Sequence, residues 1–109
     1  TIEQSDKVDG MGIDRSSNEL VLLISDHLPW LDESTHFSSL EGKLRAYLTF
    51  ISSKQYLETI PQARDLPVRI KLVHEHLPSA SARETLKAVE ERLRGVGVRF
   101  SHEGLPEGV

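Results

Sequence analysis

The sequence predicts an α+β domain, a two-layer sandwich in which a four-stranded mixed sheet carries two helices on one face. Three observations predict this fold. The apolar run from Leu20 to Ile24 is bounded by polar residues and is too short for a helix, which is typical of a strand covered on both sides. Two longer segments repeat apolar residues at steps of three and four, as helices do. Two shorter segments alternate apolar and polar residues, as half-buried strands do.

The composition limits both the domain organisation and the classes of function. A chain of 109 residues predicts a single domain over 1–109, with an ordered core over about 8–102 and frayed ends at 1–6 and 104–109. The absence of cysteine excludes disulfides and thiolate metal sites. The net charge of −4 argues against nucleic acid as a partner. No apolar run approaches a membrane span and no signal peptide is visible, so we expect a cytoplasmic protein without membrane contact.

The first two strands are expected to form a hairpin. Residues 8–13 contain Gly10 and Gly12, which weaken the strand and indicate a bulge or a close backbone contact. The polar segment 14–18 has the composition of a turn and leads directly into the strand at 19–25. The long apolar run of this second strand leaves two explanations open, a central strand or an apolar patch on the open face that is used for dimerisation.

The next element is a helix over about 34–53, with Asp32 or Ser34 as its cap. Apolar residues at helical spacing define its buried face: Phe37, Leu40, Leu44, Tyr47, Leu48 and Ile51. Residues 55–60 predict a short helical or irregular return, which Pro61 closes.

The second half of the chain predicts a strand, a helix and a strand. Residues 68–74 alternate as a half-buried strand does. A capping box from Ser81 to Glu84 starts a helix just after Pro78, and Gly95 ends it. Residues 96–100 alternate again and form the last strand. The element order is therefore β-β-α-β-α-β, and right-handed crossovers between parallel strands place both helices on one face.

Histidines supply the candidate site. His74 and His76 stand two residues apart on a predicted strand, so both imidazoles project from one face and could share a metal ion. His27, His76 and His102 follow the ends of three parallel strands, beside Asp26, at the edge where open α/β sheets bind ligands. This group suits a divalent metal or acid–base chemistry. The alternatives are ordinary polar residues at strand ends, or a pH sensor.

A second group of residues indicates an interaction surface. Arg69, Lys71 and Arg99 alternate along the last two strands and make the face opposite the helices polar, where they could meet an acidic surface or RNA. RNA is disfavoured, because RNA-binding sheets also present aromatic residues for stacking. Trp30 is expected either to cover an edge of the core or to anchor a partner.

Three segments resemble a known family. The segment Ile24–Trp30, ISDHLPW, the aromatic helix end Ala46–Ile51 and the sequence VDGMGID at 8–14 are similar to a family of short bacterial α+β proteins, a domain of unknown function. The likeness covers most of residues 8–101, the strand at 68–74 included. It implies a bacterial cytosolic protein and transfers no activity, cofactor or site residue to this chain.

The sequence therefore favours a small binding or interaction module, without catalytic activity and without a cofactor, whose ligand is a protein partner or a second copy of the chain. This preference depends on the lack of a nucleophile motif, a phosphate loop and a specific metal spacing. The alternative is a metal-assisted or acid–base enzyme that uses Asp26, His27, His76 and His102 at the strand ends.

Overall fold

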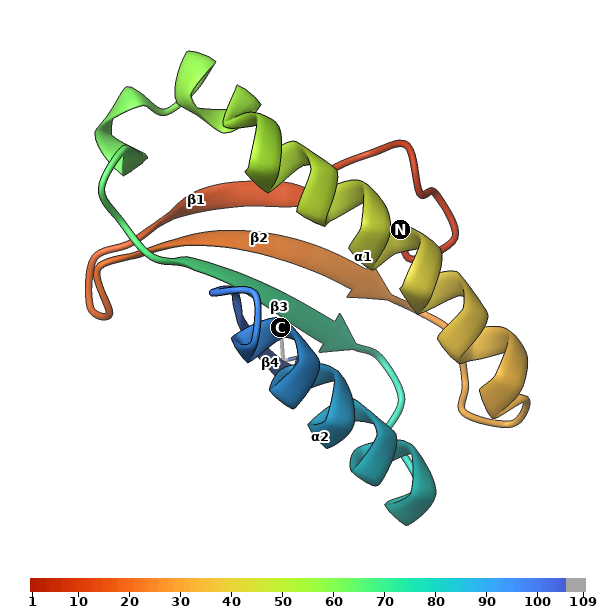
Figure 1. Cartoon of the computed structure of the whole chain (residues 1–109). Helices are drawn as coiled ribbons and strands as arrows, with labels where there is room; N and C mark the ends of the chain where they lie inside the picture. The colour runs from red at the N-terminus through yellow and green to blue at the C-terminus, as the bar shows by residue number, and fades with distance from the viewer. Residues whose placement is uncertain (106–109) are drawn as a thin grey trace.

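The structure is a computed structural model that describes residues 1–105 of the chain. Its elements come in the predicted order, with two short 3₁₀ turns after the first helix: β1 (Gly10–Asp14), β2 (Glu19–Asp26), α1 (Glu33–Ser53), η1 (Gln55–Glu58), η2 (Pro61–Ala63), β3 (Val68–His74), α2 (Ala80–Arg94) and β4 (Arg99–Gly104). The sheet order is β1-β2-β3-β4, with β1 antiparallel to β2 and the other neighbours parallel. Figure 1 shows α1 and α2 on the same face of this sheet. The predicted two-layer α+β fold is confirmed.

Strand β2 lies between β1 and β3, and its apolar run points alternately to the two faces of the sheet. Leu20, Leu22 and Ile24 point toward the helices and are completely buried. Val21 and Leu23 point to the opposite, open face, where Val21 is 9% exposed and Leu23 is 36% exposed. Strand β2 is therefore central, as one explanation required, but the helices cover only one of its faces, so the expected coverage on both sides is wrong. Val21 and Leu23 place apolar side chains on the open face, and the use of this face in a dimer remains a prediction.

The core lies between the sheet and the two helices, and α1 fills it differently from the prediction. Helix α2 buries an apolar stripe at helical spacing: Ala82, Leu86, Val89 and Leu93. Helix α1 buries His36 and Lys43 together with Leu40, Leu44 and Tyr47. The predicted Phe37, Leu48 and Ile51 are only partly buried. The buried face of α1 is thus rotated toward two polar residues, which is possible because both have hydrogen-bond partners inside the protein.

The structure packs the N-terminal residues, for which fraying was expected, against the core. Ile2 is 1% exposed in the core, and its backbone N–H donates to the carbonyl of Ser25 at 2.8 Å. The ammonium of Lys43 donates to the carbonyls of Gln4 and Lys7 at 2.6 and 2.5 Å, and to Asp9 Oδ1 at 2.9 Å. The N-terminal segment is therefore fixed to α1 by a buried lysine that the apolar periodicity did not reveal.

Some element boundaries also differ from the prediction. Helix α1 is capped by Asp32, one of the two expected residues, which accepts from the Thr35 N–H at 3.1 Å. Helix α2 begins earlier than the capping box, because Ser79 accepts from the Ala82 N–H at 3.0 Å. Strand β4 starts at Arg99, after a turn through Gly97 with φ +78°. Strand β4 runs to Gly104, the first residue of the expected frayed end 104–109. Residues 106–109 of that end lie outside the described residues.

Candidate functional site

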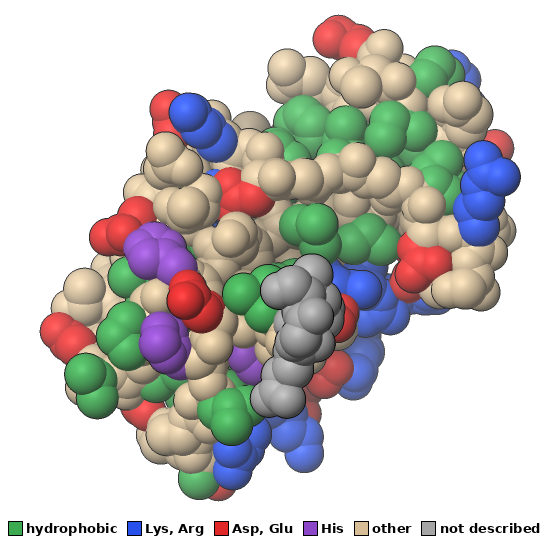
Figure 2. All heavy atoms as spheres, turned by 180° about the vertical axis from the view of Figure 1, so that it is seen from behind, with side chains coloured by type: hydrophobic (Ala, Val, Ile, Leu, Met, Phe, Trp, Pro, Cys, Tyr) green, Lys and Arg blue, Asp and Glu red, His purple; other side chains and the backbone are tan. Residues whose placement is uncertain are grey.

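The predicted site residues lie at the edge of the sheet where β2, β3 and β4 end. The strand register places Asp26 beside His74, and His74 beside Gly104. Seen from behind, the histidines gather at this edge of the molecule, on the left in Figure 2. The side chains nevertheless form two separate pairs and two isolated histidines, not a single constellation.

The first pair joins Asp26 to His36, a residue that the sequence analysis missed. Asp26 Oδ2 lies 2.6 Å from His36 Nε2, and the two side chains are 0% and 1% exposed. His36 Nδ1 lies 3.2 Å from the carbonyl of Pro29. The ring of Trp30 stacks on this imidazole with centroids 3.7 Å apart and an interplanar angle of 10°, and its Nε1–H donates to the carbonyl of His76 at 2.9 Å. Trp30 thus covers an edge of the core, as one of its two predicted roles required.

The Asp26–His36 pair has no nitrogen left for a substrate. The carbonyl of Pro29 can only accept, so His36 Nδ1 carries a proton and donates it there. The other ring nitrogen shares a proton with the Asp26 carboxylate. A general base needs a free site within hydrogen-bond reach of the substrate, and this ring is buried beneath Trp30. The pair therefore fixes the end of β2 to the start of α1.

The second pair joins His74 to His102, with His74 Nε2 3.3 Å from His102 Nδ1. His74 is 4% exposed, and its Nδ1 is the one buried side-chain nitrogen or oxygen within residues 1–105 that has no hydrogen-bond partner. Burial, followed by the nearby His102, lowers the pKa of His74, against the opposing effect of Asp26. Because a proton on Nδ1 would find no acceptor, we assign it to Nε2, which donates to His102.

The remaining two histidines stand apart from these pairs. His27 is 45% exposed and lies 3.1 Å from Glu3. Strand β3 ends at His74, so His76 lies in the following loop, where its side chain is exposed and only its carbonyl is used. The predicted shared face of His74 and His76 is therefore wrong, because the strand stops between them. No group of three metal-binding side chains occurs among the residues that the structure describes.

The predicted basic stripe lies on the open face, but its charges are paired within the chain. Glu19, whose side chain is 3% exposed, accepts from Arg69 at 2.9 Å and from Arg99 at 2.6 Å. Lys71 lies 3.1 Å from Glu103. Figure 2 shows basic and acidic side chains intermixed on the right half of this face. These ion pairs link β2, β3 and β4 within the chain. Less positive charge is therefore available to bind an acidic partner.

These pairs predict that the fold loses stability in acid. The hydrogen bond from Arg69 outweighs burial and, with that from Arg99, lowers the pKa of Glu19 to about 2. A carboxyl with a depressed folded-state pKa stabilises the fold above its ordinary pKa of 4.5, and this contribution is lost as the pH falls toward 2. We expect about 2 kcal/mol, discounted because both guanidinium groups are partly exposed.

Urea denaturation of the wild type and of Glu19→Gln at several pH values measures this loss. The stability difference between the two proteins should be largest near neutral pH and should shrink as the pH falls below 4.5. Glu84→Gln, at an exposed position of α2, is the matched control and should show no such convergence. A constant difference at every pH would contradict the assignment.

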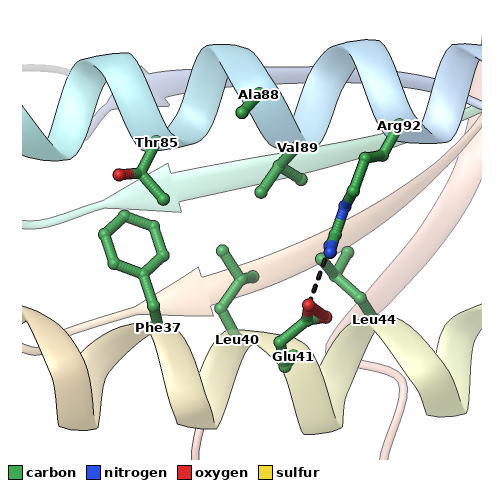
Figure 3. A pocket seen from close by; sticks show the side chains of 8 residues that line it. All are labelled: Phe37, Leu40, Glu41, Leu44, Thr85, Ala88, Val89 and Arg92. Atoms are coloured by element: carbon green, nitrogen blue, oxygen red, sulfur yellow. Dashed lines mark hydrogen bonds and ion pairs between the residues drawn. The ribbon is translucent and has the colours of Figure 1, made fainter.

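An apolar groove runs between α1 and α2 on the other side of the molecule. Figure 3 shows side chains from both helices facing each other across it, with an ion pair of 2.8 Å between Glu41 and Arg92. Its volume is about 150 Å³. Each helix lines it with four residues at helical spacing: Phe37, Leu40, Glu41 and Leu44, and Thr85, Ala88, Val89 and Arg92. Thr85 and Ala88 are too small to fill the space between the helices, which leaves the groove open.

Two leucines at the starts of these helices are almost fully exposed. Leu31 is 91% exposed and Leu77 is 86% exposed. Their loops are tied together by the Trp30–His76 hydrogen bond and by Glu33, which accepts from the hydroxyls of Ser79 and Ser81. Leu31 precedes the helix cap, where an apolar residue usually packs on the fourth helical residue. That residue is His36, which turns into the core and leaves Leu31 without a partner within residues 1–105.

Neither α1 nor α2 combines the length and the hydropathy that crossing a bilayer would require, as judged over residues 1–105.

Comparison with known protein families identifies the family of this chain. The model of the family of unknown function DUF6572 matches residues 1–105. No curated protein matches the chain, and no solved structure does. The matched range includes the strand-end edge, both helices and the groove between them. The chain therefore belongs to DUF6572, a family of unknown function.

Proposed function

We propose that this protein is a non-catalytic interaction module that binds a second copy of itself through the groove between α1 and α2. The observation that supports this proposal is the combination of an open apolar groove with two leucines, Leu31 and Leu77, that are 91% and 86% exposed. Exposed apolar area of this kind is typical of sites where proteins bind one another.

The groove has the chemistry of a docking site for an apolar side chain. Its walls are mainly apolar, and its polar groups, Glu41 and Arg92, already satisfy each other. A volume of about 150 Å³ suits a side chain of the size of leucine. A partner that enters it gains burial of apolar surface without leaving a buried charge unpaired.

A second copy is the occupant that the chain itself offers. Leu31 and Leu77 lie at the N-terminal ends of the two helices that form the groove, at the edge where both helices begin in Figure 1. In a two-fold dimer each copy presents both the leucines and the groove, so the contact closes on itself. Burying a leucine contributes about 2 kcal/mol, and association costs at least about 4 kcal/mol, so we expect a weak dimer.

Sedimentation velocity over protein concentrations from about 1 µM to about 1 mM tests this dimer. The wild type should show a sedimentation coefficient that rises with concentration. Leu31→Asp and Leu77→Asp should each remain monomeric over the same range, because they would place a carboxylate in an apolar groove. Val96→Asp is the matched control, since Val96 is an apolar residue that is 66% exposed in the α2–β4 loop, and it should behave as the wild type does.

A change in the groove tests the other half of the contact. Ala88→Arg adds a long charged side chain at the groove and should abolish the dimer while leaving the monomer folded, because Ala88 is exposed. A wild type that is monomeric at every concentration would overturn the proposal. So would a Val96→Asp variant that dissociates as readily as Leu31→Asp.

The alternative of a metal-assisted or acid–base enzyme has less support. Both nitrogens of His36 are engaged, His74 is buried, and His27 and His76 lie apart from the two pairs. A cytoplasmic location and a bacterial source remain predictions of the sequence.

A further inference from the structure

A second recess lies on the opposite side of α2, between this helix and β4. Its volume is about 370 Å³, and it is lined by residues of both elements: Arg83, Leu86, Lys87, Glu90, Phe100, Ser101 and His102. The groove between the helices uses a different set of α2 residues. The two sites therefore use different side chains of α2.

Two cations of α2 border this recess on the same side of the helix. Arg83 and Lys87 are four residues apart, so their side chains leave the helix one above the other. Arg83 Nη1 donates to the carbonyl of Pro78 at 3.0 Å, which orients the guanidinium and leaves its other N–H groups available. The ion pairs formed within residues 1–105 include neither of these two cations.

His102 supplies a third donor from the opposite wall. Its Nδ1 faces His74 Nε2 at 3.3 Å, and the proton assigned to His74 Nε2 makes His102 Nδ1 an acceptor. With Nδ1 as the acceptor, the His102 ring carries a proton on Nε2. A proton on the buried Nδ1 of His74 would find no acceptor within residues 1–105, so the His74 proton stays on Nε2 and His102 Nδ1 stays an acceptor. His102 lines the recess that Arg83 and Lys87 border, and its Nε2–H is the donor that this tautomer leaves for a ligand.

We propose that the recess between α2 and β4 binds a phosphate group through Arg83, Lys87 and His102. Three donors on two elements match the several oxygens of a tetrahedral dianion. Glu90 also lines the recess, but its carboxylate lies 4.0 Å from Arg94, which offsets its charge. The volume of about 370 Å³ exceeds that of a phosphate ion, so a small phosphomonoester also fits.

NMR titration of the full chain tests the site, with the ring resonances of His102 as the readout. Inorganic phosphate and phenyl phosphate are the two probes, and sodium chloride at equal ionic strength corrects for screening. We expect saturable shifts of the His102 ring with at least one probe. The probe that binds with the higher affinity shows whether the site prefers free phosphate or a phosphomonoester.

Variants at exposed positions distinguish binding at this specific site from general electrostatic attraction. Arg83→Gln and Lys87→Gln should each weaken binding about tenfold, as expected for the loss of one charge-assisted hydrogen bond. Arg45→Gln removes an exposed cation of α1 and should leave the affinity unchanged. The proposal is overturned if neither probe gives a saturable shift, or if the three variants bind equally well. Since all three positions are exposed, loss of the fold does not confuse the result.

Discussion

Replacing Lys43 with methionine is expected to destabilise the fold by about 3–5 kcal/mol, the usual effect of breaking a buried ion pair. The Lys43 side chain is 0% exposed, and its ammonium binds two carbonyls and the carboxylate of Asp9. Methionine has a similar length but no donor, so these oxygens lose their partner inside the protein. Urea denaturation followed by circular dichroism measures the change, and hydrogen exchange of the Ile2 amide should show the N-terminal segment opening.

Arg45→Met is the matched control for this variant. Arg45 stands two residues away on the exposed face of α1, so its replacement should change stability by less than about 0.5 kcal/mol. If Lys43→Met were as stable as Arg45→Met, the ammonium would contribute nothing to the attachment of the N-terminal segment.

Replacing His36 with leucine is expected to cost about 3–4 kcal/mol, because the buried carboxyl group of Asp26 loses the imidazole that shares its proton. The change should also alter the emission of Trp30, the one tryptophan of the chain, which stacks on the His36 ring. Urea denaturation followed by this fluorescence measures both effects. His27→Leu is the control, since His27 is 45% exposed and lies apart from the pair.

A double variant tests whether the His36 effect comes from the pair. Asp26→Leu combined with His36→Leu removes both polar partners, so no charge is left buried without compensation. The double variant should be more stable than the sum of the two single changes predicts, by more than about 1 kcal/mol. Additive losses would indicate that the two side chains stabilise the fold separately.

The fold could be predicted because the apolar periodicity of the chain matches its secondary structure. The run from Leu20 to Ile24 identified an inner strand, and right-handed crossovers placed both helices on one face. The same method missed the buried polar residues of α1, because it treats polar side chains as exposed. His36 and Lys43 nevertheless stand at helical spacing from Leu40, four residues before it and three after it. A polar residue at helical spacing within an apolar stripe was the signal that could have identified these two residues as buried.

The candidate site could be predicted only in part. Strand register brings Asp26, His74 and His102 to one edge, and this followed from the topology. The point at which each strand ends does not follow from the topology. The sequence therefore predicts His76 on a strand that in fact ends at His74. The exposure of Leu31 and Leu77 depends on how two loops pack against each other, which no local pattern reports.

The attachment of residues 1–9 to Ser25 and Lys43 has a consequence for folding kinetics. These contacts span large sequence separations and require α1 and the β1–β2 hairpin to be in place already. The start of the chain should therefore dock after the transition state has passed. Substitutions at Lys43 would then accelerate unfolding and leave the folding rate nearly unchanged.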